Sequence, residues 1–245
     1  MCHLCVPLSR RAFAGGALLL PLLHARRPVR TDLLEPSLWL TNTGGAGRTV
    51  AVTLDACPGW FDPRIADVLV GCAIPATIFV TATWMHANRP ALAFLLSRPD
   101  IFTLENHGAQ HLPPVLGDTP IYGLTPAGSL SAIRLEVLNG ATAITQATGK
   151  PPGWYRGAAG LYSPEAIPLI EGLGFRVAGY SLNSDEGASL SAASVASRIA
   201  AAQDCAVIEG HINQPHRQSG AGIAAGLAAL HAAGARFVRL DEAVA

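Results

Sequence analysis

The sequence predicts an α/β domain whose parallel sheet of about seven strands either closes into a barrel or is doubly wound. Three observations lead to this fold class. Short apolar segments rich in β-branched residues recur along the chain. Helical segments separate most of them, which is the pattern of a parallel sheet. Polar residues directly follow the apolar segments, as they do where parallel strands end at a site.

The predicted strands are 49–54, 76–82, 101–105, 153–156, 175–182, 206–210 and 236–240. Asp62 before Pro63 is an N-cap followed by a first-turn proline, and it begins a helix that runs through Val70. The same signal at Ser163 begins a helix that ends at Gly172. Alanine- and leucine-rich helices are predicted at 129–148 and 220–233. No internal repeat interrupts this order, so residues 49–245 are expected to form one domain.

The composition restricts the choice of partners. Seventeen basic residues balance seventeen acidic residues in a chain of 245, and only 14% of the residues are charged. Such a chain has no long-range field to attract nucleic acid or an anionic lipid surface. A neutral or mixed substrate fits this composition better.

Residues 1–25 have the order of an export signal: a basic region, a short apolar stretch and a small residue for cleavage near Ala25. The pattern around Arg10 and Arg11 is similar to a twin-arginine signal, and an ordinary secretory signal is the alternative. The apolar stretch is too short for a permanent membrane anchor. The mature protein is therefore expected in the periplasm or outside the cell, with residues 26–48 as a loose lead-in to the domain.

Three cysteines follow the signal, namely Cys57, Cys72 and Cys205. An odd number cannot pair completely within one chain. Cys57 follows a strand, whereas the other two precede theirs and lie at the opposite end of the sheet. A disulfide that involves Cys57 is therefore not expected.

Five predicted strands end on residues that can carry chemistry. In chain order these are Asp55, His107 and His111, Arg156, the group Asn183, Asp185 and Glu186, and His211. The carboxyl ends of parallel strands face one side of a sheet, so we expect these side chains to meet. Scattered polar residues with separate partners explain any one of them, but five strand ends together favour a site.

These residue types predict metal-assisted hydrolysis of an acyl group. The spacing of His107 and His111 is typical of metal ligands, with zinc first and cobalt or nickel as alternatives. Arg156 beside Asp55 would keep that carboxylate ionised and oriented. His211 is suited to be a general acid, because imidazole titrates near neutral pH.

Four motifs together resemble those of the polysaccharide deacetylase family, carbohydrate esterase family four. They are TLDAC, HGAQH, YRGAAG and EGH, in the family's order and over about residues 49–242. The resemblance implies a distorted barrel of seven or eight strands. It also implies metal-dependent removal of acetyl groups from N-acetylated or O-acetylated sugars, in a peptidoglycan or a chitin-like glycan.

The resemblance also implies roles for single residues. Asp55 matches the catalytic base, His107 and His111 the metal ligands, Arg156 the residue that orients the base, and His211 the general acid. The family places an acid beside that histidine. Asp185 is the choice for it here, ahead of Asn183 and Glu186.

Ala56 departs from the family's pattern, which has a metal-binding aspartate at this position. Asp55 could become the missing ligand, in which case Glu105 or Glu209 would have to act as the base. Alternatively, the ion keeps two histidines and extra waters. The substitution Ala56→Asp is expected to tighten metal binding if space permits.

The rival function is a glycan-binding relic that kept the groove and lost its metal. Ala56 favours this relic, whereas the retained set of Asp55, both histidines, Arg156 and His211 favours an enzyme. Three aromatic residues near strand ends are candidates for stacking on sugar rings, with core packing as the alternative. They are Trp60, Trp154 and Tyr155.

Overall fold

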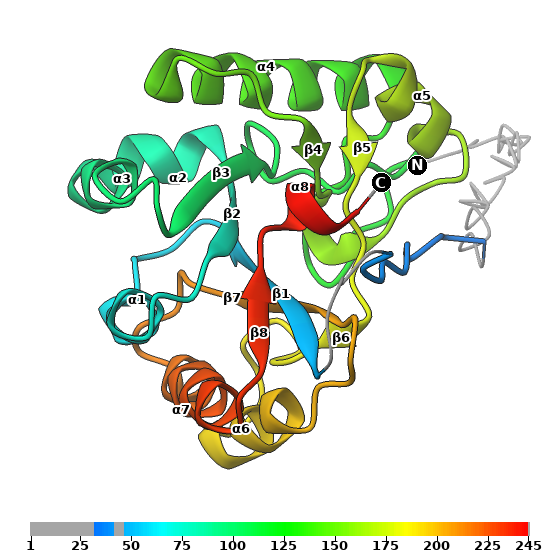
Figure 1. The fold of residues 1–245 in the computed structure, drawn as a ribbon. Helices are drawn as coiled ribbons and strands as arrows, with labels where there is room; N and C mark the ends of the chain where they lie inside the picture. The colour runs from blue at the N-terminus through cyan, green and yellow to red at the C-terminus, as the bar shows by residue number, and fades with distance from the viewer. Residues whose placement is uncertain (1–31, 42–46, 245) are drawn as a thin grey trace, which may run out of the picture. The chain divides into compact units, whose positions relative to one another are not determined.

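The sheet is parallel throughout the part of the chain that the structure describes, residues 32–41 and 47–244 of a computed structural model. Its strands run in the order β5-β4-β3-β2-β1-β7-β6, and β8 pairs with the beginning of β1 (Figure 1). Within the described residues the two ends of this order do not pair, so the sheet is a curled half-barrel. The predicted α/β fold with a distorted parallel barrel is confirmed. The predicted export signal at residues 1–25 lies outside the described residues.

The strands are short except in the middle of the sheet. Their bounds are β1 Thr49–Ala56, β2 Ala76–Val80, β3 Phe102–Asn106, β4 Trp154–Tyr155, β5 Arg176–Val177, β6 Leu182–Asn183, β7 Val207–His211 and β8 Arg236–Val238. Strand β1 is buried along its whole length between β2 and β7. Alternate side chains of a strand point to opposite faces. Val52, Leu54 and Ala56 therefore pack in the main apolar core, whereas Thr53 and Asp55 face the inside of the curled sheet.

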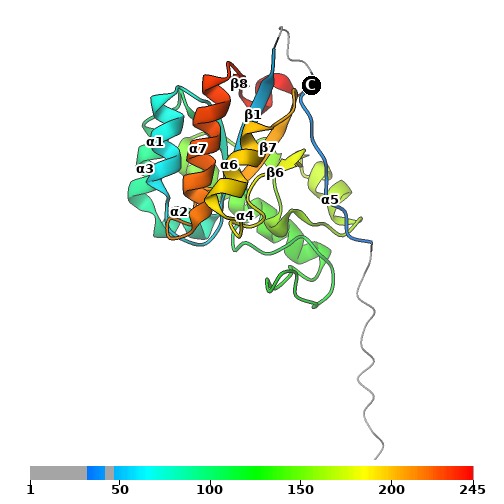
Figure 2. The same cartoon turned by 90° about the horizontal axis from the view of Figure 1, so that it is seen from below.

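Helices cover the outside of the curl (Figure 2). Their bounds are α1 Pro63–Gly71, α2 Ala82–Ala87, α3 Arg89–Leu96, α4 Leu130–Thr148, α5 Ala166–Gly172, α6 Ala192–Ala200, α7 Gln218–Ala232 and α8 Leu240–Ala243. Helices α1, α7 and α6 lie side by side against β1 and β7. The approach of α6 to α7 requires glycine, because a Cβ at Gly222 would come within 2.6 Å of the Ala192 carbonyl oxygen.

Two predicted helix starts have different outcomes. Asp62 caps α1 by accepting a hydrogen bond from the backbone N–H of Arg64, as predicted. The helix predicted to begin directly after Ser163 begins at Ala166 instead. The Ser163 hydroxyl is buried and accepts a hydrogen bond from the backbone N–H of Leu116 instead, so it holds a loop rather than a helix end.

The segment 175–182 is two short strands rather than the single predicted one. Between them the backbone pairs elsewhere: Tyr180 accepts a hydrogen bond from the N–H of Leu38. Residues 32–41 of the predicted loose lead-in thus pair with the domain at several points. Leu40 is buried in the core, and Trp39 forms a bridge with Ala206.

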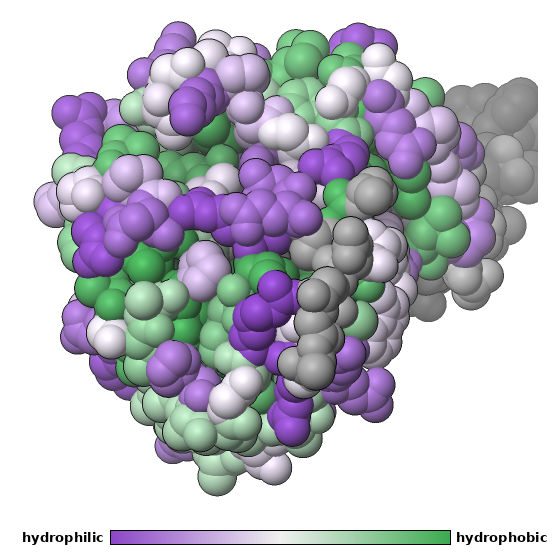
Figure 3. All heavy atoms as spheres, in the orientation of Figure 1, coloured by the Kyte–Doolittle hydropathy of each residue, from purple (hydrophilic) through white to green (hydrophobic). Residues whose placement is uncertain are grey.

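On the face seen in Figure 3, hydrophobic and hydrophilic residues are interspersed. Among the described residues, no helix combines the length and the apolar character that crossing a bilayer requires.

Candidate active site

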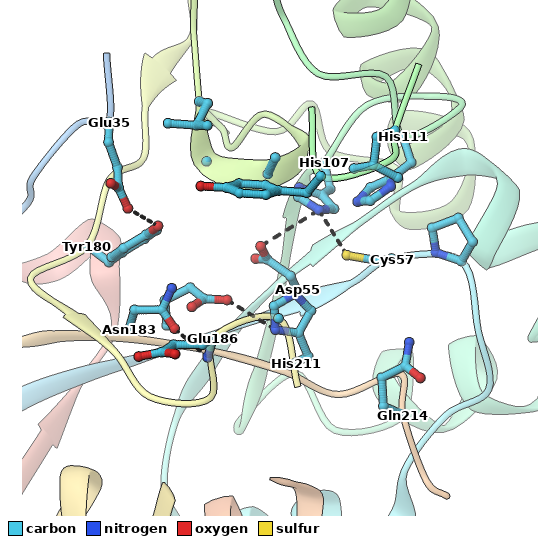
Figure 4. Close-up of a pocket in the computed structure, with 18 of the residues that line it drawn as sticks. Glu35, Asp55, Cys57, His107, His111, Tyr180, Asn183, Glu186, His211 and Gln214 are labelled. Atoms are coloured by element: carbon cyan, nitrogen blue, oxygen red, sulfur yellow. Dashed lines mark hydrogen bonds and ion pairs between the residues drawn. The ribbon is translucent and has the colours of Figure 1, made fainter. Parts of the chain in front are cut away.

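A pocket of about 770 Å³ opens at the carboxyl ends of the strands (Figure 4). The predicted residues in its wall come from β1, the β3 loop, β6 and β7. Its lining includes Glu35, Asp55, Cys57, His107, His111, Tyr180, Asn183, Glu209 and His211. The structure thus brings together side chains that lie more than 150 positions apart in the sequence.

Asp55 ends the inward-facing row of β1, and Arg156 holds it in place. The Arg156 guanidinium donates from one nitrogen to Asp55 Oδ1 at 2.9 Å and from another to the Thr53 hydroxyl at 2.9 Å. Its remaining donors reach the carbonyl oxygens of Ala178 and Gly179. Burial raises the pKa of Asp55, but His107 and Arg156 outweigh it, so this pKa lies below its usual value. Asp55 is therefore an ionised, fixed carboxylate, as a base must be.

His107 has a fixed tautomer. Its Nδ1 lies 2.7 Å from the Arg156 carbonyl oxygen, which can only accept, so Nδ1 carries the hydrogen. The lone pair of a neutral His107 is then on Nε2, which lies 3.7 Å from Asp55 Oδ2. Burial lowers the pKa of His107, but the charges of Asp55 and Cys57 outweigh it and raise this pKa to about 9. The negative field that holds a proton here would equally attract a metal cation.

The loop that carries both histidines is tied to helix α4. The buried Glu136 carboxylate accepts hydrogen bonds from the backbone N–H groups of Gln110 and Leu112, on either side of His111. His111 itself has a φ of +66°, a left-handed conformation that costs free energy for a side chain with a Cβ. Glu136 is a positioning residue that the sequence pattern does not reveal. A buried acid on the apolar face of a predicted helix is the only signal that would indicate it.

Cys57 is the main site residue to which the family motifs assign no role. Its Sγ lies 3.3 Å from His107 Nε2, and the side chain is buried in the pocket wall. Burial raises the pKa of this thiol, but His107 outweighs that effect and brings the pKa well below its usual value. The alternation of side chains along β1 could have indicated Cys57, because residues 55 and 57 lie on one face of the strand and Ala56 lies on the other.

These residues offer a donor set for a metal ion. One atom each of Cys57, His107 and His111 lie within 4.8 Å of one another. Sulfur and imidazole nitrogen are zinc ligands, and three protein ligands with an open position are typical of catalytic zinc. His111 Nε2 is buried and has no hydrogen-bond partner, so this nitrogen is available to bind a metal ion. The residues therefore fit a divalent metal.

His211 lies on the other side of Asp55 and is held by a carboxylate. Its Nδ1 donates to Asp185 Oδ1 at 2.9 Å, and its backbone N–H donates to Asp185 Oδ2. Burial lowers the pKa of His211, but Glu209 and Asp185 outweigh it and raise this pKa well above its usual value. The structure thus places Asp185, rather than Asn183 or Glu186, against His211.

Glu209 also lies in the pocket, with Oε1 3.3 Å from His211 Nδ1. Asp55, Glu209 and His211 form a second group with donor atoms close enough to hold an ion. Burial raises the pKa of Glu209 to about 8. With His211 Nδ1 already bonded to Asp185 and Asp55 held by Arg156, this group suits a metal less well than the Cys57 group does.

Glu105, considered as a substitute base, lies outside the pocket lining. Its carboxylate accepts hydrogen bonds from the backbone N–H groups of Gly153 and Trp154. It therefore anchors β4 and cannot serve as a base in the pocket.

The predicted sugar-stacking residues divide into two classes. Trp154 and Tyr155 are 3% and 0% exposed and pack in the core, so their position does not support a substrate contact. β4 is buried on both faces, so the two adjacent rings pack in separate core clusters. Trp60 is 65% exposed on the loop after Cys57, and its role stays a prediction.

One wall of the pocket comes from the lead-in segment. Glu35 lines the pocket and accepts a hydrogen bond from the Tyr180 hydroxyl, as Figure 4 shows. No periodicity or motif in the sequence connects these two residues, which are brought together by backbone pairing of residues 34–40 with the domain.

The polysaccharide deacetylase family model matches residues 43–178, more than half of the chain. The chain belongs to the polysaccharide deacetylase family. This family member also has the fold of solved deacetylases. The Bc1960 peptidoglycan N-acetylglucosamine deacetylase superposes with a TM-score of 0.66 at 19% identity, covering 80% of this chain and 87% of that one.

Two further structural neighbours differ from each other in activity. The peptidoglycan deacetylase PdaC of Bacillus subtilis matches with a TM-score of 0.63 at 19% identity, covering 80% of this chain and 90% of that one. BA3943 of Bacillus anthracis, a pseudoenzyme of carbohydrate esterase family four, matches with a TM-score of 0.65 at 17% identity. The match covers 86% of this deacetylase family member and 70% of that chain. No curated protein sequence matches this family member.

Proposed function

We propose that this protein is an exported, metal-dependent deacetylase that hydrolyses acetyl groups on N-acetylated or O-acetylated sugars. The observation that carries the proposal is the arrangement around Asp55. On one side lie two imidazoles and a thiol suited to a metal ion, and on the other lies His211 held by Asp185. A base, an acid and a metal site around one pocket are the groups that hydrolysis of an acyl group requires.

Asp55 acts as the general base. It accepts the proton of the water that attacks the acetyl carbonyl carbon, and Arg156 keeps the carboxylate ionised and aimed into the pocket. Burial of Arg156 at 1% exposure makes this orientation rigid. The rigid pair reduces the reorganisation needed when charge moves in the reaction.

His211 acts as the general acid. Its Nδ1 is bonded to Asp185, which leaves Nε2 to carry the proton to the leaving amine or alkoxide as its bond to the acetyl carbon breaks. The products are acetate and the free amino or hydroxyl group of the sugar.

A divalent metal, with zinc first and cobalt or nickel as alternatives, would be held by His107 and His111. When bound, the ion polarises the acetyl oxygen and stabilises the charge that develops there. The protein holds His107 in the required tautomer through the Arg156 carbonyl, and Glu136 fixes the loop of His111.

The test is acetate release from a panel of glycans by protein that has been stripped of metal and reloaded. The panel contains N-acetylglucosamine oligomers, peptidoglycan fragments and an O-acetylated glycan. We expect release only with metal, and from the N-acetylated members in particular. The structural neighbours support a peptidoglycan or chitin-like substrate, since both solved enzymes named above are peptidoglycan deacetylases.

The second candidate is a glycan-binding relic of the same fold. Ala56 favours it, as does the structural likeness to the pseudoenzyme BA3943, a mutant of which has restored activity. A relic would bind acetylated glycans with the same affinity with and without metal and would release no acetate. The retained Asp55–Arg156 and His211–Asp185 pairs favour the enzyme, because binding alone does not need them.

Export through the twin-arginine pathway completes the proposal. It rests on the sequence of residues 1–25, which the structure does not describe. Replacing Arg10 and Arg11 with lysine should leave uncleaved precursor in the cytoplasm, as judged by fractionation and immunoblotting. Unchanged export of this variant would contradict the twin-arginine pathway and favour an ordinary secretory signal.

A further inference from the structure

The geometry points to Cys57 as the third protein ligand of the metal, in the place of the missing carboxylate at position 56. This inference deepens the proposed function, because it rests on a metal site in the same pocket. The ion would be held by one sulfur and two imidazole nitrogens, from Cys57, His107 and His111. Asp55 would then remain free to act as the base.

The direction of the chain at the end of β1 determines which side chains reach the pocket. Ala56 is fully buried and packs in the apolar core on the helix side of the strand. Asp55 before it and Cys57 after it both line the pocket. The side chains of this strand end that line the pocket are therefore those of positions 55 and 57, and Arg156 already holds Asp55 at 2.9 Å.

The distance between the donor atoms is close to that in a tetrahedral zinc site. A tetrahedral zinc ion with Zn–S and Zn–N bonds of ordinary length separates sulfur from nitrogen by about 3.5 Å. Cys57 Sγ lies 3.3 Å from His107 Nε2, the ring nitrogen that does not bond the Arg156 carbonyl. Little movement is needed to place an ion between them.

The hydrogen-bond partners of the two imidazoles also suit metal ligands. His107 donates its other nitrogen to a backbone carbonyl, which is the usual arrangement of a metal-ligating histidine. The His111 ring lies 5.0 Å from the His107 ring between centroids, and its buried Nε2 has no hydrogen-bond partner. Figure 4 shows both rings and the Cys57 sulfur on the same side of Asp55.

The competing explanation is that Cys57 is a nucleophile and His107 its base, since a thiol 3.3 Å from an imidazole is also the arrangement of acyl-transfer enzymes. The substitution Cys57→Asp separates the two. A carboxylate can bind a divalent metal in place of the thiolate, but it cannot form a thioester. The matched control is Cys72→Ser, because Cys72 is also a free cysteine but lies outside the pocket lining.

The experiment loads stripped full-length mature protein with Co²⁺ and records its absorption spectrum, its metal content and its acetate release. A thiolate ligand gives a sulfur-to-cobalt charge-transfer band in the near ultraviolet. We expect this band in the parent and in Cys72→Ser, but not in Cys57→Ser or Cys57→Asp. Metal affinity should fall in Cys57→Ser by more than the roughly 100-fold that loss of an outer-shell partner costs. Cys57→Asp should bind metal and release measurable acetate.

Three other results would contradict the inference. Cobalt uptake by the parent without the charge-transfer band, together with acetate release, would overturn the inference and leave the proposed function standing. Acetate release by metal-free parent, abolished in Cys57→Asp, would overturn it in favour of a nucleophile. A folded parent that takes up no metal and releases no acetate would contradict both the inference and the proposed function. Circular dichroism of each variant checks that it is folded.

The substitution Ala56→Asp gives a positional control. Tighter metal binding is expected only if space permits, and the structure leaves little, because the new carboxylate would enter an apolar core with no partner. We expect Ala56→Asp in the Cys57→Ser background to leave metal affinity low and to reduce the melting temperature. Restored metal binding in this double variant would contradict the position of residue 56 in the core and with it the first reason for choosing Cys57.

Discussion

His107 and His211 lie on opposite sides of Asp55, and their Nδ1 atoms have different partners. The His107 Nδ1 donates to the backbone carbonyl of Arg156, whereas the His211 Nδ1 donates to the carboxylate of Asp185. A carbonyl fixes the tautomer and keeps Nε2 as the nitrogen that an ion can bind once its proton has left. A carboxylate stabilises the charged ring that a proton donor must be. The same side chain is thus prepared for two roles by the charge of its neighbour.

The exposure of the two rings agrees with these roles. The side chain of His107 is 1% exposed and lies beside Cys57, where an ion would be enclosed. The side chain of His211 is 17% exposed, so that a substrate in the pocket can reach it. The comparison predicts that substitutions on the two sides of Asp55 separate metal binding from proton transfer.

The largest effect is expected on the metal side. His107→Ala and His111→Ala should each abolish stoichiometric metal binding and, with it, acetate release, because each removes a ligand. Metal content after stripping and reloading is the measurement. His211→Ala is the matched control and should keep its metal. Metal loss in His211→Ala of the same size would remove the distinction between the two sides.

On the acid side, His211→Ala should lower kcat by about 10²–10⁴-fold while metal content and fold stay unchanged. The reason is that the leaving group then departs without a proton from the protein. Steady-state kinetics on an N-acetylated oligomer, together with circular dichroism, provide the measurement. A folded variant with full activity would show that His211 is not the acid.

A smaller and more specific effect is expected for Asp185→Asn. The Asp185 carboxylate helps to raise the pKa of His211, so its neutralisation should lower that pKa. The alkaline limb of the kcat profile should move to lower pH by roughly one unit or more, since the acid form is lost earlier. An unshifted limb with reduced kcat would indicate that Asp185 only holds the ring in position.

The smallest effect on activity is expected for Glu105→Gln, which tests a buried acid outside the pocket. Burial raises the pKa of Glu105 to about 7. A raised carboxyl pKa contributes stability that is complete below about pH 4.5 and is lost as the pH rises through about 7. Between pH 4.5 and 8 the parent should therefore lose about 3 kcal/mol more unfolding free energy than the variant. Urea unfolding at several pH values is the measurement. Equal pH dependence in the parent and the variant would contradict this account, and changed acetate release would place Glu105 in the site.

The sequence predicts those parts of the fold and site that local patterns determine. The buried strand ending at Asp55, the Asp62 cap and the helix at 130–148 follow from apolar runs and capping residues. His107, His111, Arg156 and His211 follow from their positions directly after strands.

The remaining features depend on contacts between distant parts of the chain. Glu35 reaches the pocket only because residues 34–40 pair with Tyr162, Tyr180 and Cys205. Trp154 and Tyr155 are both buried because their short strand is covered on both faces. Cys57 differs from these cases, because alternation along β1 places it beside Asp55 without any long-range information.

The central claim is that a metal-dependent hydrolytic site is intact despite Ala56. Its most direct test is metal content and acetate release of the same stripped and reloaded parent protein, with an N-acetylglucosamine oligomer as substrate. The account predicts about one bound divalent ion per chain and acetate release that appears only after reloading. Folded parent protein that binds the oligomer, takes up no metal and releases no acetate would contradict it and establish the glycan-binding relic.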